Sequence, residues 1–178
     1  MSKRSFLYYD EVETPVGPIT LVQDHKGLCR VDFGTFQSLS THHNNWARKY
    51  FLCPEFTKDT AKLSEAKRQF LQYFRGERFE FDLKFQFYGT PFQQKVWNAL
   101  YEHIPYGETR AYKDIAMAIQ APKAIRAIGG AVNRNPLSII IPCHRVIGSN
   151  GKLVGYNGGL DIKRHLLEME MPKALFNF

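Results

Sequence analysis

The sequence predicts an α+β fold in two parts. Residues 1–88 are expected to form a small antiparallel sheet with a helix, and residues 89–178 a mainly helical domain with a winged-helix-like helix-turn-helix. Strand-like runs separated by turn residues are concentrated in the first part, and apolar residues three or four positions apart in the second. Between them, the Tyr-Gly-Thr-Pro sequence at residues 88–91 is typical of a linker. With 178 residues, 44% of them apolar, the chain can bury a core and is not mainly disordered.

The first part begins with a predicted β-hairpin. Residues 19–22 and 28–33 are strand-like runs joined by a Lys-Gly turn. Residues 36–60 are polar and lack a clear periodicity, so they are expected to be irregular. A helix is predicted over residues 61–74, where apolar residues recur every four positions. The most regular strand is expected over residues 79–87, because phenylalanine and leucine alternate there with polar residues.

The second part begins with a predicted helix. Thr90 is a suitable N-cap for it, and Pro91 a suitable first helical residue. Two short helical patterns follow, over residues 111–119 and 122–132, and the turn between them gives the spacing of a helix-turn-helix. This pattern has low specificity by itself, because many pairs of short helices share it.

The remainder combines an apolar run, a turn and a helix. Residues 138–141 are a serine and three isoleucines, an apolar and β-branched run that is expected to form a strand ending at Pro142 and Cys143. Residues 149–152 contain Asn-Gly, which favours the positive backbone angles of a hairpin turn. A final helix is predicted over residues 160–170, after a pair of glycines breaks the chain.

The charge distribution points to a polyanionic partner. The chain has 24 Lys/Arg and 17 Asp/Glu, a net charge of +7. Residues 110–152 contain seven basic residues and a single acidic one, Asp114. A basic stretch in an otherwise mixed chain is typical of nucleic-acid binding, with a basic surface that has no partner as the alternative. No apolar run approaches the ~20 residues that span a bilayer, so no membrane segment is expected.

Cys143 is the candidate nucleophile. It lies in the sequence Ile-Pro-Cys-His-Arg, where His144 or Arg145 would lower the pKa of its thiol by stabilising the thiolate. Each of these two residues also has a structural alternative. Cys143 could be a buried structural cysteine, and Arg145 could form a structural ion pair. Cys29 and Cys53 have no such neighbours. Without a secretory signal, the three cysteines are expected to be free thiols in a reducing cytoplasm, and the Cys and His spacing predicts no metal site.

Four segments of the second part form a longer pattern. They are Arg-Ala-Ile-Gly-Gly-Ala at residues 126–131, Asn-Pro at 135–136, Ile-Pro-Cys-His-Arg-Val-Ile at 141–147 and Gly-Tyr-Asn-Gly-Gly-Leu at 155–160. Together they resemble the O6-alkylguanine-DNA alkyltransferase family. The Pro-Cys-His-Arg core is highly specific, and the resemblance is close over residues 91–170 and weaker in the first part.

The resemblance implies repair of O6-alkylguanine, and less well of O4-alkylthymine, in double-stranded DNA. The alkyl group would move irreversibly to Cys143, once per molecule, without a cofactor. A thiolate suits this reaction, because attack on an alkyl carbon needs a soft, strong nucleophile. His144 would deprotonate Cys143 through a water, oriented by Glu170, although Glu168 is an equal candidate from sequence alone. A monomeric cytoplasmic protein is expected.

The resemblance also implies that the damaged nucleotide is rotated out of the duplex. A helix would enter the minor groove, where Arg126 would fill the gap in the base stack. Tyr112 would help to rotate the nucleotide and would donate a hydrogen bond to the flipped base. The other DNA-binding candidates, which supply phosphate contacts or allow close approach, are Lys123, Arg110, Arg134, Gly129 and Ala131. Tight helix packing is the alternative reason for the small residues.

The pocket for the flipped base is expected to be lined by residues around Cys143: Tyr112, Asn135, Val146, Tyr156, Asn157, Gly158 and Gly159. The resemblance implies that the carbonyls of Cys143 and Val146 accept from the guanine amino group, and that the N–H of Asn157 donates to the guanine oxygen. Some relatives have serine in place of Asn157 and proline in place of Ser138. These departures bear on bulky adducts rather than on the reaction.

Three other functions compete with this interpretation. A non-catalytic lesion-binding protein, like the alkyltransferase-like relatives, would lack the cysteine that this chain has at position 143. A helix-turn-helix transcription regulator would read bases in the major groove, whereas the helix around Arg126 is rich in small apolar residues. A cysteine hydrolase would turn over repeatedly, whereas a single event is predicted.

Overall fold

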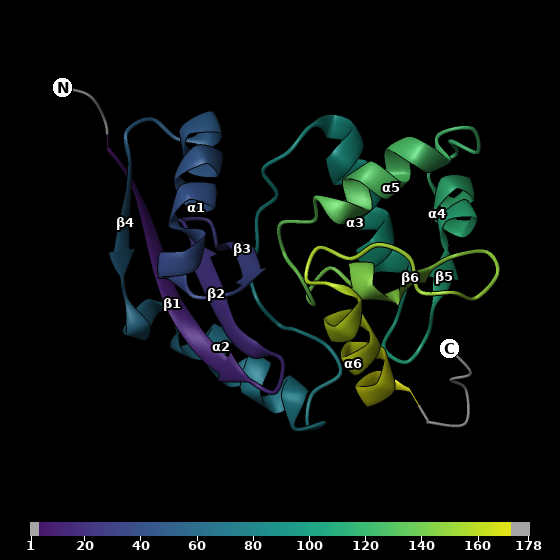
Figure 1. The fold of residues 1–178 in the computed structure, drawn as a ribbon. Coiled ribbons are helices and arrows are strands. Elements are labelled where there is room, and N and C mark those ends of the chain that lie inside the picture. The colour runs from purple at the N-terminus through teal and green to yellow at the C-terminus, as the bar shows by residue number, and fades with distance from the viewer. Residues whose placement is uncertain (1–3, 172–178) are drawn as a thin grey trace. The chain divides into compact units, whose positions relative to one another are not determined.

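The computed structural model describes residues 4–171, and the chain divides into two compact units, Met1–Tyr88 and Gly89–Phe178 (Figure 1). We name them the N-terminal unit and the C-terminal unit. The predicted α+β class is confirmed, because the first is built on a sheet and the second mainly on helices.

The N-terminal unit contains a four-stranded sheet. Its strands are β1 (Ser5–Thr14), β2 (Gly17–Gln23), β3 (Leu28–Phe33) and β4 (Pro54–Lys58), in the order β3-β2-β1-β4. The β1–β2 and β2–β3 pairs are antiparallel, whereas β4 lies parallel to β1. The predicted hairpin is therefore confirmed as β2 and β3, and the sheet as a whole is mixed.

Two helices complete this unit. α2 (Thr60–Phe74) is the predicted helix, and the Asp59 side chain caps it by accepting a hydrogen bond from the Lys62 backbone N–H. α1 (Phe36–Tyr50) and β4 occupy the region expected to be irregular, so that expectation is wrong. The buried face of α1 is narrow, which leaves too few apolar residues for a periodic signal; it consists of His43, Trp46 and Ala47.

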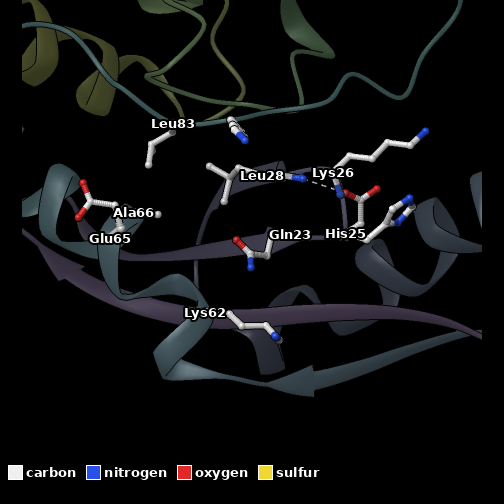
Figure 2. Close-up of a pocket in the computed structure, with 11 residues that line it drawn as sticks. Gln23, His25, Lys26, Leu28, Lys62, Glu65, Ala66 and Leu83 are labelled. Carbon is white, nitrogen blue, oxygen red and sulfur yellow. Dashed lines mark hydrogen bonds between the residues drawn. The ribbon is translucent and has the colours of Figure 1, made fainter.

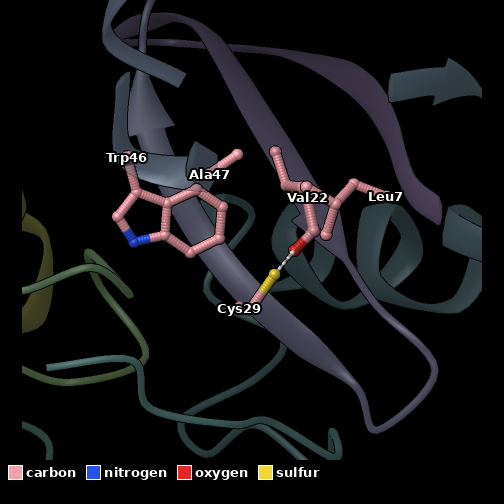
Figure 3. Packing of buried hydrophobic residues seen from close by; sticks show 5 residues of the cluster. All are labelled: Leu7, Val22, Cys29, Trp46 and Ala47. Atoms are coloured by element: carbon pink, nitrogen blue, oxygen red, sulfur yellow. Dashed lines mark hydrogen bonds between the residues drawn. The ribbon is translucent and has the colours of Figure 1, made fainter. Parts of the chain in front are cut away.

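Part of the core of this unit is formed by residues from β1, β2, β3 and α1. The buried cluster, shown in Figure 3, consists of Leu7, Val22, Cys29, Trp46 and Ala47. Within it, the Cys29 thiol donates to the Val22 carbonyl at 3.4 Å, and burial raises the pKa of this thiol. Cys29 is therefore a structural cysteine.

The strand predicted over residues 79–87 is wrong. The segment is irregular over most of its length and meets β3 at one bridge, between Phe85 and Leu28. There the Leu28 N–H donates to the Lys84 carbonyl, and the Gln86 N–H donates to the Leu28 carbonyl, both at 2.8 Å. Alternating phenylalanines favour burial of one face, but burial alone does not supply a neighbouring strand for a full ladder.

The C-terminal unit is mainly helical. Its described elements, in chain order, are α3 (Pro91–His103), β5 (Arg110–Ala111), α4 (Tyr112–Ala118), α5 (Ile125–Asn133), the 3-10 turn η1 (Cys143–Arg145), β6 (Val146–Ile147) and α6 (Leu160–Glu170). The predicted helices are confirmed, and α6 has the predicted bounds. β5 and β6 form a short parallel pair.

α3 begins as predicted. The Thr90 side chain accepts from the Gln93 N–H at 3.2 Å, the Gln93 side chain accepts from the Thr90 N–H at 2.9 Å, and Pro91 is the first helical residue. Further along, the buried Trp97 indole donates to the Ala131 carbonyl at 2.9 Å. This hydrogen bond fixes α5 against α3.

The predicted helix-turn-helix consists of α4, a turn and α5. The turn passes through Gln120, whose φ of 57° lies in the left-handed region. α5 buries Ile128 and Val132 in the core of the unit, whereas Arg126 in its first turn and Lys123, just before the helix, are exposed. The second helix therefore presents positive charge to solvent.

Residues 138–141 form overlapping turns, so the strand predicted there is wrong. The Ile141 N–H donates to the Leu137 carbonyl at 2.9 Å, and Ile139 has a φ of 73°, which is strained for a β-branched residue. Local hydrogen bonds thus override the β-branched composition of this segment.

The turn predicted over residues 149–152 is confirmed, because the Gly148 N–H donates to the Lys152 carbonyl at 2.9 Å. The expected hairpin is not formed. Residues 153–154 are not a strand, and β6 pairs with β5 instead.

Candidate active site

Cys143 is held by the side chain of Asn135. Asn135 Nδ2 donates to the Ile141 carbonyl at 2.8 Å and lies 3.0 Å from Cys143 Sγ, while its Oδ1 accepts from the Leu137 N–H at 2.9 Å. Asn135 and Cys143 are each 3% exposed. One amide group therefore fixes both the overlapping turns and the position of the sulfur atom.

Glu170, at the end of α6, contacts both residues that follow the cysteine. His144 Nε2 lies 2.8 Å from Glu170 Oε1, and Arg145 Nε donates to Oε2 at 2.7 Å. Arg145 also donates to the Ile104 carbonyl at 2.7 Å. Arg145 thus forms a structural ion pair, which is the alternative that the sequence left open. The glutamate that lies beside His144 is Glu170, the one that the resemblance implies.

The protonation states follow from these contacts. Burial acts against the charge of Glu170, but His144 and Arg145 outweigh it and hold the pKa of this carboxyl well below its usual range. Burial lowers the pKa of His144 despite the opposing charge of Glu170. An ionised carboxylate only accepts hydrogen bonds, so His144 Nε2 carries the proton and Nδ1 is the basic nitrogen. Nδ1 is buried and has no hydrogen-bond partner among the described residues.

Cys143 rests as a thiol, so the expectation that its neighbours lower its pKa is wrong. Burial raises the pKa of the thiol by more than the Asn135 hydrogen bond and the charge of Lys163 lower it. Arg145 is directed at Glu170 instead of the sulfur. The sulfur therefore needs a base, and it also needs access, because it is almost fully buried.

Sequence reasoning missed one residue of this cluster, Lys163. It is 0% exposed, and its ammonium donates to three backbone carbonyls of the segment that follows Cys143. A signal was available in the sequence: Lys163 shares its helix face with Leu166, Leu167 and Glu170, all of which are buried.

Two tyrosines lie close enough to Cys143 for its thiolate to affect them. Burial raises the pKa of Tyr112 and of Tyr156, and the charge of Cys143 acts in the same direction on both. The Tyr112 hydroxyl also donates a long hydrogen bond, 3.5 Å, to the Val154 carbonyl. A Cβ placed on Gly129 would lie 3.8 Å from the Tyr112 ring. Tyr112 and Tyr156, which are both predicted to line the pocket, are thus the tyrosines whose pKa the Cys143 thiolate affects.

The rest of the predicted pocket wall is a surface loop before α6. Asn157 and Gly159 are exposed, Gly158 is half-buried, and the Gly159 N–H closes the turn by donating to the Tyr156 carbonyl at 3.0 Å. Val146, in contrast, is fully buried. Loops of this kind are the parts of a protein that move most easily.

A cationic cavity lies beside the helix-turn-helix. It has a volume of about 560 Å³, and Lys123, Arg126 and Arg134 line it together with Thr90 and Gln93 at the start of α3. None of its lining residues is acidic. Three cations without a carboxylate among them favour an anionic ligand such as a phosphate group.

Two of the predicted DNA-binding cations have protein contacts. Arg110 Nη2 pairs with Glu108 Oε2 at 2.7 Å, which partly neutralises it. Arg134 Nη1 lies 3.3 Å from the Gly130 carbonyl, and its side chain still lines the cationic cavity. Lys123 and Arg126 are therefore the more available charges.

The small residues of α5 differ in placement. Ala131 is 2% exposed, so its side chain belongs to the core and is not a surface for DNA. Gly129 is half-buried, and a Cβ there would make only an ordinary contact with Tyr112. Tight helix packing therefore does not explain why residue 129 is a glycine.

The N-terminal unit has a cavity of about 260 Å³, shown in Figure 2. Its acids are already engaged: Asp24 accepts from the backbone N–H groups of Lys26 and Gly27, and Glu65 pairs with Arg68. No cysteine lines this cavity. It therefore offers no counterpart to the cluster around Cys143.

Among residues 4–171, no group of three or more His, Cys, Asp and Glu side chains is arranged to hold a metal ion. Over the same residues, no helix combines the length and apolar character needed to cross a membrane.

The fold and the site together define a class: a helix-turn-helix unit that carries a buried cysteine, followed in sequence by a histidine paired with a carboxylate. Comparison with known families gives the same two parts. Residues 91–172 match the model described as 6-O-methylguanine DNA methyltransferase, DNA binding domain, and residues 7–87 match the ribonuclease-like domain of the same protein.

Individual relatives are similar over nearly the whole chain. A methylated-DNA--protein-cysteine methyltransferase of Methanosarcina barkeri is 50% identical and covers 92% of this chain and 97% of its own. The constitutive enzyme of Bacillus subtilis with the same name is 46% identical, and the match covers 92% of this chain and 94% of the enzyme. The Mycobacterium tuberculosis OGT crystallised in complex with DNA has a TM-score of 0.77 and 42% identity, and covers 96% of this chain and 97% of its own. This chain belongs to the methylated-DNA–protein-cysteine methyltransferase family.

Proposed function

We propose that this chain repairs O6-alkylguanine and O4-alkylthymine in double-stranded DNA by moving the alkyl group irreversibly to Cys143. The observation that carries the proposal is the buried cluster of Cys143, Asn135 and the His144–Glu170 pair, in a unit that exposes a cationic helix. Family membership supports the same activity. We further propose that the protein acts as a monomer in the cytoplasm, a reducing compartment that suits its free cysteines.

The reaction begins with removal of the Cys143 proton. His144 Nδ1 takes it, directly or through a water, because Nε2 is already engaged by Glu170. Arg145 keeps Glu170 ionised, so the imidazolium that forms lies next to a carboxylate. A positioned base of this kind contributes typically about 10²–10⁴-fold to the rate.

Alkyl transfer follows as a displacement at carbon. The thiolate of Cys143 forms the S–C bond, the C–O6 bond breaks, and the electron pair stays on the guanine oxygen. The released base takes up one proton, which balances the proton taken from the thiol. The thioether is a very poor leaving group, so each molecule reacts once and needs no cofactor.

The substrate has to leave the base stack to reach the sulfur. Arg126 is exposed at the start of α5 and is proposed to fill the gap that the nucleotide leaves. Tyr112, whose ring would lie 3.8 Å from a Cβ on Gly129 of that helix, is proposed to rotate the nucleotide and to donate a hydrogen bond to the base. Val146, Tyr156, Asn157, Gly158 and Gly159 would then surround it. Lys123, Arg110 and Arg134 are proposed to contact phosphates.

A labelled duplex tests the proposal. The protein is incubated with a duplex that carries O6-methylguanine labelled in the methyl group, and is then digested. We expect one labelled peptide, containing Cys143, that saturates at one methyl per chain. Label on Cys29 or Cys53, or methyl released without limit, would contradict the proposal.

The C143S variant separates binding from transfer. It should lose methyl transfer and still bind the duplex, because binding depends on the cationic helix. A large loss of DNA binding by this variant would show that the roles are not divided in this way.

A further inference from the structure

The segment that follows α3 contacts Arg145 through two different groups. Ile104, the C-cap of α3, is 1% exposed, and its carbonyl accepts from Arg145 Nη1 at 2.7 Å. The ring of Tyr106 lies over the same guanidinium, with 5.7 Å between the ring centroid and Arg145 Cζ. This distance is within the range of a cation–π contact, and arginine is the cation that stacks best on aromatic faces. A carbonyl and an aromatic ring of one short segment thus hold the arginine.

The same segment contacts the last turn of α6. The Tyr106 hydroxyl donates to the Met169 carbonyl at 3.4 Å, and a Cβ on Gly107 would lie 3.4 Å from the Glu170 carbonyl oxygen. Burial, and after it the charge of Glu170, raise the pKa of the Tyr106 hydroxyl. Tyr106 therefore lies against the guanidinium of Arg145 and against the backbone that carries Glu170.

The Oε1 atom of Glu170 connects this packing to the reaction. It accepts from Arg145 Nη2 at 3.0 Å and lies 2.8 Å from His144 Nε2. The side chains of Arg145 and Glu170 are only 9% and 0% exposed, so water hardly competes for their hydrogen bonds. Removal of the ring would let water reach the guanidinium and would weaken the attraction between the two charges. The oxygen that orients the imidazole would then be less firmly placed.

We propose that Tyr106 is a positioning residue for the base. Its aromatic ring holds Arg145, and Arg145 fixes the Glu170 oxygen that orients His144. This inference rests on the proposed function, in which His144 removes the Cys143 proton. It assigns Tyr106 no contact with DNA or with the sulfur. It requires the aromatic face, rather than the hydroxyl, to act, and to act through Glu170.

Two substitutions at this position separate the face from the hydroxyl. Y106L keeps an apolar side chain and removes the aromatic face, whereas Y106F keeps the face and removes the hydroxyl. Y101L is the matched control, because Tyr101 is an exposed tyrosine on α3 and undergoes the same change. Methyl transfer from a bound duplex containing O6-methylguanine is measured under single-turnover conditions. Binding to undamaged duplex and the rate of iodoacetamide alkylation, followed on the Cys143 peptide, are measured in parallel.

We expect Y106L to lower the rate constant for methyl transfer by about 10-fold, which corresponds to loss of a largely desolvated cation–π contact. Alkylation by iodoacetamide should slow by the same factor, because both reactions need the thiolate. Y106F should keep most of the wild-type rate, since the hydroxyl contact of 3.4 Å is long for a hydrogen bond. Binding to undamaged duplex should be unchanged in both variants, which also reports an intact C-terminal unit. Y101L should match the wild type throughout.

Combination with E170Q tests whether the ring acts through the carboxylate. In the E170Q background, Y106L should cause little further loss of rate, because residues that act through one another are not additive. A ring that only stabilised the fold would lower the rate by the same factor in both backgrounds.

Three results would overturn the inference: wild-type rates in Y106L, equal losses in Y106L and Y106F, or fully additive losses in the double variant Y106L/E170Q. Failure of the proposed function gives a different result, because iodoacetamide alkylation does not involve DNA. A wild-type protein that accepted no methyl group, while Y106L still slowed alkylation by iodoacetamide, would refute the repair reaction and leave the positioning role of Tyr106 in place.

Discussion

Cys143 combines deep burial with a raised thiol pKa, which separates it from cysteines that rest as thiolates. Because the thiolate is the reactive form, a resting thiol is protected from unrelated electrophiles and oxidants. In the proposed mechanism its activation depends on His144, whose imidazole Glu170 orients. A protein that reacts once benefits from such restraint, since every stray alkylation removes a molecule.

Substitution of Glu170 tests this dependence at the level of one residue. E170Q keeps the shape of the side chain but removes the charge that favours the imidazolium, so we expect a fall of about 10²-fold in the rate of methyl transfer. Single-turnover kinetics on a methylated duplex measure it. E168Q is the matched control, because Glu168 is exposed on the same helix and was an equal candidate from sequence. Equal losses in the two variants would contradict the role of Glu170.

Asp32 gives a prediction for stability against pH. Burial opposes its charge, but Arg30 and His43 prevail and lower its pKa from 3.8 to about 2. A carboxyl whose pKa is lower in the folded state contributes stability above its unfolded pKa, and that contribution is lost as the pH falls from about 4 toward 2. The shift corresponds to roughly 2 kcal/mol.

Urea unfolding at a series of pH values from 6 to 2 tests this. The free energy of unfolding of D32N should be lower than that of the wild type at pH 6 and should depend less on pH below 4. D161N changes an exposed aspartate and should keep the wild-type profile. If the free energy of unfolding of D32N fell below pH 4 as steeply as that of the wild type, Asp32 would not have a lowered pKa.

At the scale of elements, the sequence predicts structure where local signals and tertiary packing agree. α3 has its capping box, and α6 has apolar residues on one face that become buried. The strands predicted over residues 79–87 and 138–141 are not formed, for two different reasons. The first has the pattern of a strand but no partner beyond one bridge. The second has the composition of a strand, but Asn135 supplies hydrogen bonds that hold turns instead.

The candidate site follows the same division. The motif around Cys143 and His144 is contiguous in sequence, so the resemblance to the family locates it, and Glu170 with it. Lys163 donates hydrogen bonds to backbone carbonyls of residues 8 to 17 positions away, and carbonyl groups have no sequence signature. The thiol pKa was predicted in the wrong direction because the effect of burial cannot be read from neighbouring residues.

The contact between the β2–β3 turn and the 84–86 segment gives a prediction at this scale. Gly27 has a φ of +143°, and a Cβ there would lie 2.4 Å from the Lys84 carbonyl oxygen. Gly17 also has a positive φ, +94°, but nothing lies within 4 Å of its Cβ position. G17A should cost only backbone strain, roughly 1–2 kcal/mol. G27A should cost roughly 2 kcal/mol more, because the segment must move.

Chemical denaturation of the two variants measures the difference. The bridge between Leu28 and Phe85 should open in G27A alone, which hydrogen exchange of the Leu28 and Gln86 amides would detect. Equal free energies of unfolding for G17A and G27A would show that the 84–86 segment is free to withdraw at no cost.

At the scale of the whole molecule, the charges and the chemistry are unevenly shared between the units. Residues 90–178 carry 11 basic and 6 acidic residues, against 13 and 11 in residues 1–89. The cationic cavity and the cysteine cluster both belong to the C-terminal unit. One unit thus contains the groups proposed for binding DNA, for extruding the nucleotide and for accepting the alkyl group.

Within that unit, attraction to DNA and extrusion of the nucleotide should be separable. Lys123 is proposed to neutralise a phosphate, so K123A should weaken binding to every duplex alike and reduce the slope of log affinity against log salt by about 1. Arg126 is proposed to replace the extruded nucleotide, so R126A should slow methyl transfer chiefly where extrusion is difficult. A lesion opposite its normal partner is harder to extrude than a mispaired one, which makes the pairing state the discriminating variable.

The comparison uses fluorescence anisotropy over a salt series and single-turnover transfer from paired and mispaired lesions. R126A should lose more rate on the paired lesion than on the mispaired one, whereas K123A should lose the same factor on both, through binding. Lys95, exposed on α3 and outside the cationic cavity, provides the control, and K95A should leave both quantities at the wild-type values. If R126A repaired the two lesions with an equal loss of rate, its charge alone would account for its effect, and the gap-filling role would have to be abandoned.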